Sequence, residues 1–494
     1  MRWLFPLLAA CTPQESTFEA TFPDGFEWGS ATAGFQVDMG CPTWSSEACD
    51  DVASDWYQWV NAPEIVENDS LYVSGEPVGN GPGMWETFEA DVDLMQAQGL
   101  NAYRMSLEWS RLFPDPNTET ATTVEALDAY ANPEAVSRYH EFFAALAAAD
   151  IHPLVTLNHY TLPLWVHDGV ACHLDRETCT ADGWVNEARI TSLIALYAGW
   201  VAKEFGAEID AWATLNEPFA TTLSGYTLPG EDRSSPPGLS LDISRTVAVM
   251  KNQIVGHARM YDAIKQYDTV DADGDGDASA VGIVMNMTAI DPKDPTNELD
   301  VTGADHMDYL YHRLYFEALT AGAWDEDLDG IVDETRDDLA NTLDYIVINY
   351  YNQVLTAGLP IVLYDKLPVF DFFPEFSWEP YPEGLERVVR QAAAYDLPIV
   401  VTENGTPFVE DQGSEVLKGH LRGLEHALAD GIDVQGYYYW SFVDNYEWNH
   451  GFDLRFGLYE LEPTTKERRP REVLSTYADI IARGRVDLPN EDDE

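Results

Sequence analysis

The chain has 494 residues, of which 45% are hydrophobic and 12% aromatic. This composition supports a large core and excludes a disordered, collagenous or coiled-coil chain. Its 86 acidic residues against 27 Lys and Arg residues give a net charge of -59, which excludes nucleic-acid binding and argues against adhesion of the protein surface to anionic lipids.

The first residues resemble a secretory signal. Residues 1–10 combine Arg2, a short apolar run and small residues before Cys11. The order Leu-Ala-Ala-Cys also resembles a bacterial lipoprotein processing box, in which Cys11 would be lipidated and become the new N-terminus. The alternative is a wrongly assigned start codon, because the apolar run is short even for a signal.

We therefore predict export, as a periplasmic or cell-surface lipoprotein or as a secreted protein, with a short tether over residues 11–19. No later stretch reaches the roughly 20 apolar residues of a membrane-spanning helix. Contact with a membrane is expected only through a lipid anchor at Cys11.

Four further cysteines form two local pairs, Cys41 with Cys49 and Cys172 with Cys179. Close, even spacing in an exported chain predicts two disulfides. The alternative is a zinc site, but it would normally use Cys-x-x-Cys pairs or more histidine than the single His173 beside one pair.

Short apolar runs alternate with longer amphipathic stretches between residues 20 and 485, without a linker. The predicted strands cover 26–32, 100–107, 152–159, 209–216, 280–288, 343–351, 397–402 and 434–442. The predicted helices cover 85–98, 133–149, 186–205, 244–267, 306–319, 382–395, 415–429 and 471–482.

Eight strands, each followed by a helix, predict the α/β class and a single (β/α)8 TIM barrel with loop insertions over residues 20–485, followed by an acidic tail over 486–494. Barrels of this class can exceed roughly 400 residues as one domain. The alternative is a doubly wound open sheet, but no G-x-G-x-x-G follows the first strand.

Two predicted strands end in a glutamate beside asparagine and a turn former, Glu217 in TLNEP and Glu403 in VTENG. Because they end the fourth and seventh strands, their side chains should meet at the carboxyl end of the barrel from opposite sides. Such a pair suits glycosidic cleavage, which needs one protonated and one ionised carboxyl group. For either glutamate alone, a helix cap or an ion pair is the plainer alternative.

These strings resemble the acid/base and nucleophile motifs of glycoside hydrolase family 1, the retaining β-glycosidases. FPDGFEWGSATAGFQVDMG, RMSLEWSRLFP, TLNHYTLPLW, INYY and YWSFVDNYEWNHGFDLRFGL extend the resemblance along nearly the whole mature chain. SDWYQWV and SGEPVGNGPGMW are closer to the archaeal-type branch than to plant or typical bacterial members.

The resemblance implies a double-displacement mechanism with retention, in which Glu217 is the general acid/base and Glu403 the nucleophile. Arg104, at the end of the second strand, would keep the nucleophile ionised by charge pairing. It implies no cofactor for catalysis. Further implied roles are substrate binding by Gln36, His159, Asn216, Tyr351, Trp440, Glu447 and Trp448, with Tyr351 also bonded to the nucleophile and Trp440 as an aromatic platform.

The implied substrate is a small neutral β-glycoside or oligosaccharide, because a carboxylate at Glu447 repels a 6-phosphate. The glutamate at position 217 argues against a myrosinase-like thioglucosidase. Asn158 and Tyr160 depart from common family residues, so the preferred sugar cannot be copied. The insert closed by Cys172 and Cys179 follows the third strand and is expected to shape the aglycone cleft.

Two acidic loops have the spacing of the first half of a calcium loop. Their candidate ligands are Asp271, Asp273, Asp275 and Asp277 in one loop and Asp325, Asp327, Asp329 and Asp333 in the other. Gly282 and Arg336 replace the bidentate Glu of an EF-hand, which excludes that motif. We predict structural calcium at the bottom of the barrel, with a solvated acidic turn as the alternative.

The sequence thus predicts an exported, exo-acting β-glycosidase for β-glucosides or β-galactosides, with β-fucosides and β-mannosides as further candidates. Two alternatives remain at this point. One is a catalytically silent carbohydrate-binding barrel, although a binding protein needs no acid and nucleophile together. The other is an endo-β-glucanase, which would have an open groove.

Overall fold

The computed structural model describes residues 21–360 and 367–486. The predicted signal over residues 1–10, the lipidation site Cys11, the tether over 11–19 and all of the acidic tail except Val486 lie outside the described residues.

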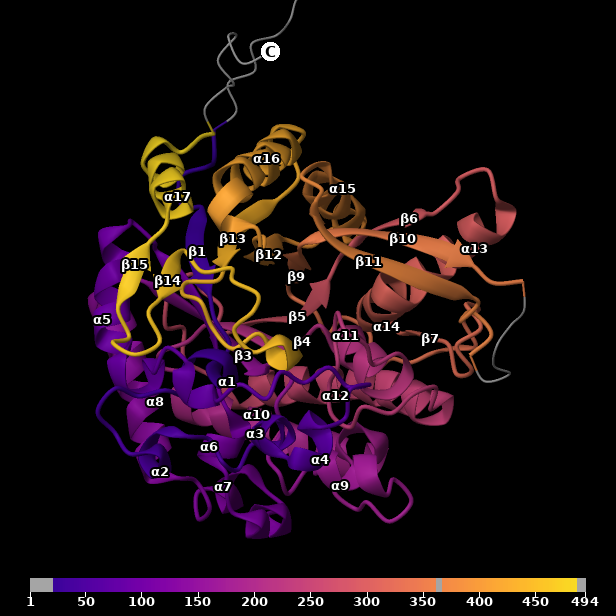
Figure 1. Ribbon diagram of the computed structural model, residues 1–494, viewed down its shortest axis with the longest axis horizontal. Coiled ribbons are helices and arrows are strands. Elements are labelled where there is room, and N and C mark those ends of the chain that lie inside the picture. The colour runs from indigo at the N-terminus through magenta and orange to yellow at the C-terminus, as the bar shows by residue number, and fades with distance from the viewer. Residues whose placement is uncertain (1–20, 361–366, 487–494) are drawn as a thin grey trace, which may run out of the picture.

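Eight parallel strands close into a barrel in the order β1-β13-β12-β9-β5-β4-β3-β2 (Figure 1). Their bounds are β1 (Glu27–Ala31), β2 (Ala102–Ser106), β3 (His152–Asn158), β4 (Ala211–Asn216), β5 (Ala280–Asn286), β9 (Ile346–Tyr350), β12 (Ile399–Asn404) and β13 (Val434–Trp440). Each strand falls within or beside one predicted run. The barrel prediction is confirmed, and closure of the sheet excludes the open, doubly wound alternative.

The helices that surround the barrel agree with the predicted ones, except that two helices in the second half of the chain begin earlier than predicted. The main helices are α5 (Met84–Ala97), α8 (Pro133–Ala148), α10 (Glu187–Phe205), α12 (Ile243–Tyr267), α13 (Glu298–Asp308), α14 (Leu314–Ala321), α15 (Glu383–Ala392), α16 (Val409–Ala429) and α17 (Glu472–Arg483). Helical structure begins at Glu298 and not at residue 306, because the Asn297 side chain caps it and a π-helical segment, η5 (Tyr309–Arg313), breaks the regular period. Helix α16 begins at Val409 and not at residue 415, with Glu410 and Asp411 in its first turn.

Short elements fill the connections. The helices are α1 (Gly34–Val37), α2 (Ser46–Cys49), α3 (Asp55–Asn61), α4 (Pro63–Val66), α6 (Trp109–Leu112), α7 (Val124–Leu127), α9 (Gly169–Leu174) and α11 (Pro218–Thr222). Helical turns of other types are η1 (Val78–Asn80), η2 (Pro116–Thr120), η3 (Gly183–Val185), η4 (Leu223–Thr227), η6 (Ala393–Tyr395) and η7 (Trp448–His450), and two hairpins are formed by β7 (Ala323–Trp324) with β8 (Glu334–Thr335) and β14 (Tyr459–Leu461) with β15 (Arg468–Pro470).

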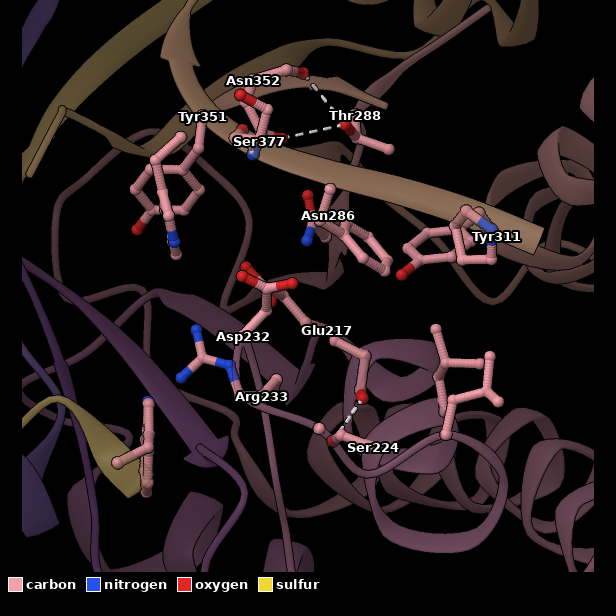
Figure 2. A pocket seen from close by; sticks show the side chains of 18 of the residues that line it. Glu217, Ser224, Asp232, Arg233, Asn286, Thr288, Tyr311, Tyr351, Asn352 and Ser377 are labelled. Carbon is pink, nitrogen blue, oxygen red and sulfur yellow. Dashed lines mark hydrogen bonds between the residues drawn. The ribbon is translucent and has the colours of Figure 1, made fainter. Parts of the chain in front are cut away.

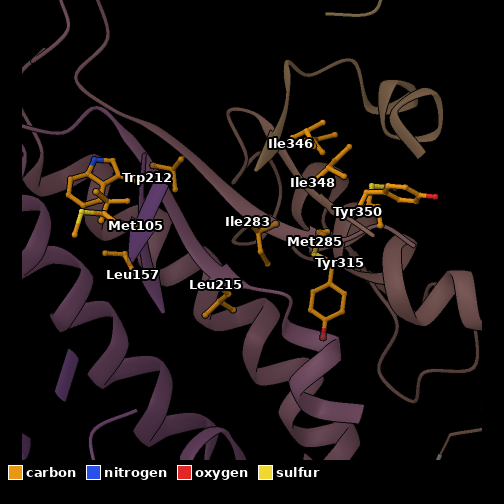
Figure 3. Packing of buried hydrophobic residues seen from close by; sticks show 14 of the residues in the cluster. Met105, Leu157, Trp212, Leu215, Ile283, Met285, Tyr315, Ile346, Ile348 and Tyr350 are labelled. Atoms are coloured by element: carbon orange, nitrogen blue, oxygen red, sulfur yellow. The ribbon is translucent and has the colours of Figure 1, made fainter. Parts of the chain in front are cut away.

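Side chains that alternate along each strand belong to two different apolar layers. Met105, Trp212 and Ile348 belong to the layer between strands and helices, part of which is visible in Figure 3. Ala102, Ala213 and Val347 belong to a second cluster, with side chains on the opposite face of the strands, inside the barrel. Arg104 shares the inner face of β2 with Ala102. It lies in the middle of that strand, which corrects its predicted place at the strand end.

A three-stranded sheet outside the barrel was not predicted. It consists of β6 (Ala289–Pro292), β10 (Asn352–Gly358) and β11 (Phe372–Pro380) in the order β11-β10-β6, and α13 packs against it (Figure 1). Only Tyr351 separates β9 from β10, so one apolar run covers the end of a barrel strand and the start of a strand in another sheet. Periodicity alone does not mark such a change of sheet.

Both predicted disulfides are present, Cys41–Cys49 and Cys172–Cys179. The zinc alternative for these cysteines is therefore wrong. Among the residues that the structure describes, no helix combines the length and the apolar character needed to cross a bilayer.

Candidate active site

A cavity of about 560 Å³ opens at the carboxyl ends of the barrel strands. Residues that follow β3, β4, β9 and β13 line it, together with β11 of the outer sheet. In Figure 2, Glu217 and Arg233 lie across this cavity from Thr288 and Ser377. Both predicted catalytic glutamates line the same cavity, as expected for residues at the ends of β4 and within β12.

Glu217 follows β4 directly and is only 5% exposed. Its backbone has a φ of +44°, in the left-handed region that residues other than glycine rarely adopt. Asn349 Nδ2 donates a hydrogen bond to Oε1 at 2.8 Å, and the Tyr160 hydroxyl donates to Oε2 at 2.7 Å. These neutral donors hold both carboxylate oxygens of Glu217, and no described cationic side chain forms an ion pair with it.

Glu403 has a different environment. Arg104 Nη1 lies 2.5 Å from its Oε1, and the Tyr351 hydroxyl donates to Oε2 at 2.6 Å. Arg104 is fully buried, so this ion pair is shielded from solvent. The structure therefore brings together the charged partner and the phenol that the resemblance assigned to this carboxylate.

The two carboxyl groups influence each other's protonation. Burial raises the pKa of Glu403 to about 7, and the neighbouring Glu217 adds to the rise, while Arg104 and Tyr351 lower the pKa. Two close, buried carboxyl groups cannot both ionise easily, so they titrate as a pair. Arg104 forms its ion pair with Glu403, so its charge stabilises the ionised form of that carboxyl group.

A relay of hydrogen bonds sets the orientation of His159. Arg104 Nη2 donates to Asn216 Oδ1 at 2.7 Å, which leaves Asn216 Nδ2 to donate to His159 Nε2 at 3.1 Å. Burial lowers the pKa of His159 well below its usual value, with Arg104 and Arg233 adding to the effect, so the imidazole is neutral. Its proton therefore lies on Nδ1, which has no hydrogen-bond partner among the described residues. A buried donor without a partner beside a cavity suits a ligand hydroxyl.

Glu447 lines the cavity, and Gln36 lies next to it. Gln36 Nε2 donates to Glu447 Oε2 at 3.1 Å, and Gln36 Oε1 is a buried acceptor without a partner in the described part of the chain. Gln36 does not line the cavity in this structure, because it lies behind Glu447. Asn216 likewise does not line the cavity and donates to His159, so in this structure the two amides position neighbouring side chains. Their contacts with sugar hydroxyls stay predictions.

Aromatic rings line the cavity beside His159. The rings of Trp440 and Trp448 lie nearly parallel to the His159 ring, at centroid distances of 6.0 and 5.9 Å. Both tryptophans line the cavity, and Trp448 also stacks on Phe35. Flat apolar surfaces beside polar groups suit a pyranose ring, which has hydroxyl edges and C–H faces.

Three residues of the site were assigned no role from the sequence, although Tyr160 was expected at the entrance to the glycone site. Tyr160 and Asn349 contact Glu217, and Arg233 Nη1 donates to Glu447 Oε1 at 3.1 Å. Asn349 is a polar residue within an apolar strand run, which is a usable signal in the sequence. Arg233 follows Gly-Glu-Asp in a loop after β4. A lone basic residue in so acidic a chain is a weaker sequence signal than the polar Asn349 in an apolar strand.

The insert closed by Cys172–Cys179 does not line the cavity, contrary to the prediction. Helix α9 of the insert packs against α3, and His173 Nδ1 contacts the Pro237 carbonyl oxygen at 2.9 Å. The insert therefore braces the loop after β4 from outside. Leu228, Tyr311 and Phe376 line the outer part of the cavity instead.

The acidic loops form two groups of carboxylates whose oxygens lie within 4.8 Å of one another. The first group consists of Asp210, Asp271 and Asp273, near the amino end of β4 as expected, and the second of Asp325, Asp327 and Asp333. Asp275, Asp277 and Asp329 lie outside these groups; Asp275 and Asp329 accept backbone N–H bonds within their own turns.

The second loop does not lie at the bottom of the barrel, because the β7–β8 hairpin folds back along the helices. Tyr309 of η5 donates to Asp325, and Lys251 of α12 donates to the Glu326 carbonyl oxygen. Calcium binding by either loop stays a prediction.

Comparison with known proteins agrees with this geometry. Residues 18–485 match the family model described as glycosyl hydrolase family 1. The chain is 34% identical to a β-galactosidase of Pyrococcus woesei, covering 94% of this chain and 98% of the relative. It is 32% identical to a β-galactosidase of Saccharolobus solfataricus, covering 94% and 96%.

Solved structures give the same result. The β-glycosidase from Thermosphaera aggregans superposes with a TM-score of 0.80 at 28% identity, covering 94% of this chain and 98% of that chain. A β-glucosidase from Pyrococcus furiosus superposes with a TM-score of 0.79 at 26% identity, covering 95% and 97%.

Proposed function

The chain belongs to glycosyl hydrolase family 1 and is a glycoside hydrolase, and from this premise we propose that it removes single β-linked glycosyl residues from the non-reducing end of small glycosides. β-Glucosides and β-galactosides are the proposed substrates, in keeping with the names of the relatives and structural neighbours. β-Fucosides and β-mannosides remain further candidates. Enzymes of this family need no cofactor for catalysis, so the chemistry falls to side chains.

The contrast between the two glutamates carries the proposal. Glu403, ionised beside Arg104, attacks the anomeric carbon while Glu217 gives its proton to the leaving oxygen. This step forms a glycosyl ester on Glu403 and leaves Glu217 ionised. Glu217 then takes a proton from water, the water attacks the anomeric carbon, and Glu403 leaves as a carboxylate. Two inversions at one carbon give overall retention.

The ester intermediate changes the electrostatics of the pair. Once Glu403 is esterified it carries no negative charge, so it no longer repels the charge that Glu217 has acquired by donating its proton. Asn349 and Tyr160 stay bonded to Glu217 and stabilise the carboxylate that has formed. One residue can therefore act as an acid in the first step and as a base in the second.

The proposed sugar-binding groups gather at the inner end of the cavity. His159 Nδ1 offers a donor and Gln36 Oε1 an acceptor, while Glu447 accepts and Trp440 supplies an apolar face. A cluster of polar groups and an aromatic face suited to one pyranose ring favours removal of a terminal sugar over internal cleavage of a polymer. An endo-β-glucanase would need an open groove on both sides of the glutamates.

Hydrolysis of para-nitrophenyl β-glucoside, β-galactoside, β-fucoside and β-mannoside tests this proposal, with Glu403→Gly and Glu217→Gln beside the wild type. We expect turnover of at least one substrate, its loss in Glu403→Gly, and survival of the first step in Glu217→Gln because nitrophenol leaves without protonation. Normal turnover of an unactivated disaccharide by either variant would contradict the assigned roles. A folded wild type without turnover on any of these substrates would contradict the activity.

We further propose that the enzyme acts after export, as a lipoprotein or a secreted protein. Its two disulfides support an oxidising compartment. Radiolabelled palmitate incorporation, compared between the wild type and Cys11→Ser, separates the two forms. Label in the wild type alone supports the lipid anchor, and absence of label from exported wild type supports secretion.

A further inference from the structure

One cation of the cavity has no part in the mechanism described above. Arg233 belongs to the loop between η4 and α12, and its side chain lines the cavity with 26% of its surface exposed. The other ionisable side chains lining the cavity include the carboxylates of Glu217, Asp232, Glu403 and Glu447. Among the described lining residues Arg233 is the one guanidinium, so its charge and its N–H donors strongly affect which ligands the cavity binds.

The loop that carries Arg233 is fastened to the segment that carries Glu447. The Ser234 backbone N–H donates to Asn449 Oδ1 at 3.2 Å, and Asn449 Nδ2 donates to the Glu231 carbonyl oxygen at 3.2 Å. His450 Nε2 contacts the Asp232 carbonyl oxygen at 2.9 Å. These contacts join two segments more than 200 residues apart in sequence, so the position of Arg233 is built into the fold.

Glu447 is held from two sides. Gln36 donates to Oε2 and Arg233 donates to Oε1, each at 3.1 Å. A carboxylate has about four lone-pair sites, so each oxygen can accept one more hydrogen bond. Glu447 is the one side-chain hydrogen-bond partner of Arg233 within the described residues, and a guanidinium has five N–H donors. Arg233 and Glu447 together therefore present free donors and free acceptors at one point of the cavity.

We propose that Arg233 is a specificity-determining residue that binds the sugar directly: its guanidinium donates to a hydroxyl oxygen of a neutral pyranose while Glu447 accepts from an adjacent hydroxyl. This inference rests on the proposed function, because it assigns the sugar to this end of the cavity. Vicinal hydroxyls are both donors and acceptors, so a paired cation and carboxylate match them better than a carboxylate alone. Arg233 also neutralises Glu447, which otherwise adds a further negative charge to the cavity that contains Glu403.

The chain offers a matched control in Arg245. Its side chain is 25% exposed and pairs with Asp242 at 2.8 Å, close to Arg233 in sequence. Arg245 does not line the cavity. Replacing it removes a guanidinium and an ion pair of the same kind without touching the proposed sugar site.

The test compares Arg233→Met, Arg233→Lys and Arg245→Met by calorimetric titration with glucose and galactose, which needs no turnover, and by kcat and KM on the para-nitrophenyl glycosides. For Arg233→Met we expect a rise of about tenfold or more in the dissociation constant of the better-bound sugar and in KM, the loss typical of a hydrogen bond to a charged group. Arg233→Lys keeps the charge but not the planar fork, so it should recover part of the loss. Arg245→Met should bind sugar like the wild type.

Sugar binding within twofold of the wild type in both Arg233 variants would overturn the inference, as would equal losses in Arg233→Met and Arg245→Met. Absence of sugar binding by the wild type would overturn it as well. Thermal melting of each variant shows whether it is folded, and Arg233→Lys serves if Arg233→Met does not fold. The proposed function fails separately, through absence of hydrolysis by the wild type, so the two failures are distinguishable.

Discussion

The Tyr160 hydroxyl donates a hydrogen bond of 2.7 Å to Oε2 of Glu217, from a backbone whose φ is +73°. Glu217 and Trp448 also have positive φ values, +44° and +47°. Conformations of this kind cost of order 1–3 kcal/mol each and persist where the surrounding structure enforces them. Three such residues around one cavity show that the fold maintains unfavourable backbone conformations in order to aim these side chains.

Tyr160→Phe should slow the second chemical step more than the first. The lost hydrogen bond stabilises the ionised form of Glu217, which acts as the base when water attacks the glycosyl ester. We expect kcat on a para-nitrophenyl glycoside to fall about tenfold, the value of one hydrogen bond to a charged group, with a burst of nitrophenol before steady state. Stopped-flow absorbance measures the burst. A fall in rate without any burst would place the effect of Tyr160 on the first step.

Tyr351→Phe should move the acid side of the pH profile to higher pH. The hydrogen bond from Tyr351 lowers the pKa of Glu403, so its removal raises that pKa further. The ionised nucleophile is then lost at a higher pH, and kcat/KM measured against pH should show the shift. Tyr261→Phe removes a hydroxyl that donates to Asp344 outside the cavity and should leave the profile unchanged. An unshifted acid limb in Tyr351→Phe would contradict this role.

Sodium azide should distinguish the two glutamates by the configuration of the product. In Glu403→Gly the missing carboxylate leaves room for azide on its side of the anomeric carbon, so a single displacement gives the inverted glycosyl azide. In Glu217→Ala the glycosyl ester still forms with an activated substrate, and azide then replaces water on the other face to give the retained product. Proton NMR of the anomeric coupling identifies each product. If Glu403→Gly gave the retained azide and Glu217→Ala the inverted one, the acid/base and nucleophile roles of the two glutamates would have to be exchanged.

Glu108→Gln should raise stability at alkaline pH relative to the wild type. Burial raises the pKa of Glu108 to about 8, with the Asp51 carboxylate adding to the rise, whereas in an unfolded chain a glutamate titrates near 4.3. Between these values the folded chain holds a proton that the unfolded chain has lost, so stability falls as pH rises through this window. Glutamine mimics the protonated acid and does not titrate.

The difference in melting temperature, Glu108→Gln minus wild type, should therefore grow from pH 5 to pH 9. Calorimetric scans at each pH measure it. Glu64→Gln, at an exposed position, provides the control and should show a difference that does not change with pH. If the difference in melting temperature between Glu108→Gln and the wild type were constant from pH 5 to pH 9, protonation of Glu108 would not be linked to stability.

Removal of the Cys41–Cys49 disulfide by replacement of both residues with alanine should lower stability by about 2.5 kcal/mol. This figure follows from the closure entropy of a loop whose ends are 8 residues apart. Because the entropy of unfolding scales with chain length, the melting temperature should fall by only about 2–3 °C. Melting of both proteins with and without a reductant checks the value, since the wild type and the variant should melt alike when both are reduced and Cys172–Cys179 is open in each. Identical melting of the oxidised wild type and the variant would show that this disulfide adds no stability.

The sequence alone determined the barrel and the two glutamates. Strand periodicity is a local property, and a residue that ends a parallel strand must face the carboxyl end of the barrel whatever the loops do. Glu217 and Glu403 could therefore be assigned to one cavity from the order of the strands and the residues at their ends. The disulfides were predictable for a similar reason, because each closes a short loop.

Only the tertiary structure decided what surrounds these groups. Arg233 reaches Glu447, Gln36 lies behind it, and the Cys172–Cys179 insert turns away from the cavity, because loops from distant strands pack against one another. The tautomer of His159 likewise depends on a relay that starts at Arg104 in another strand. Such contacts join residues far apart in the chain, and no local pattern encodes them. They arise only when the closed barrel brings the loops to one face.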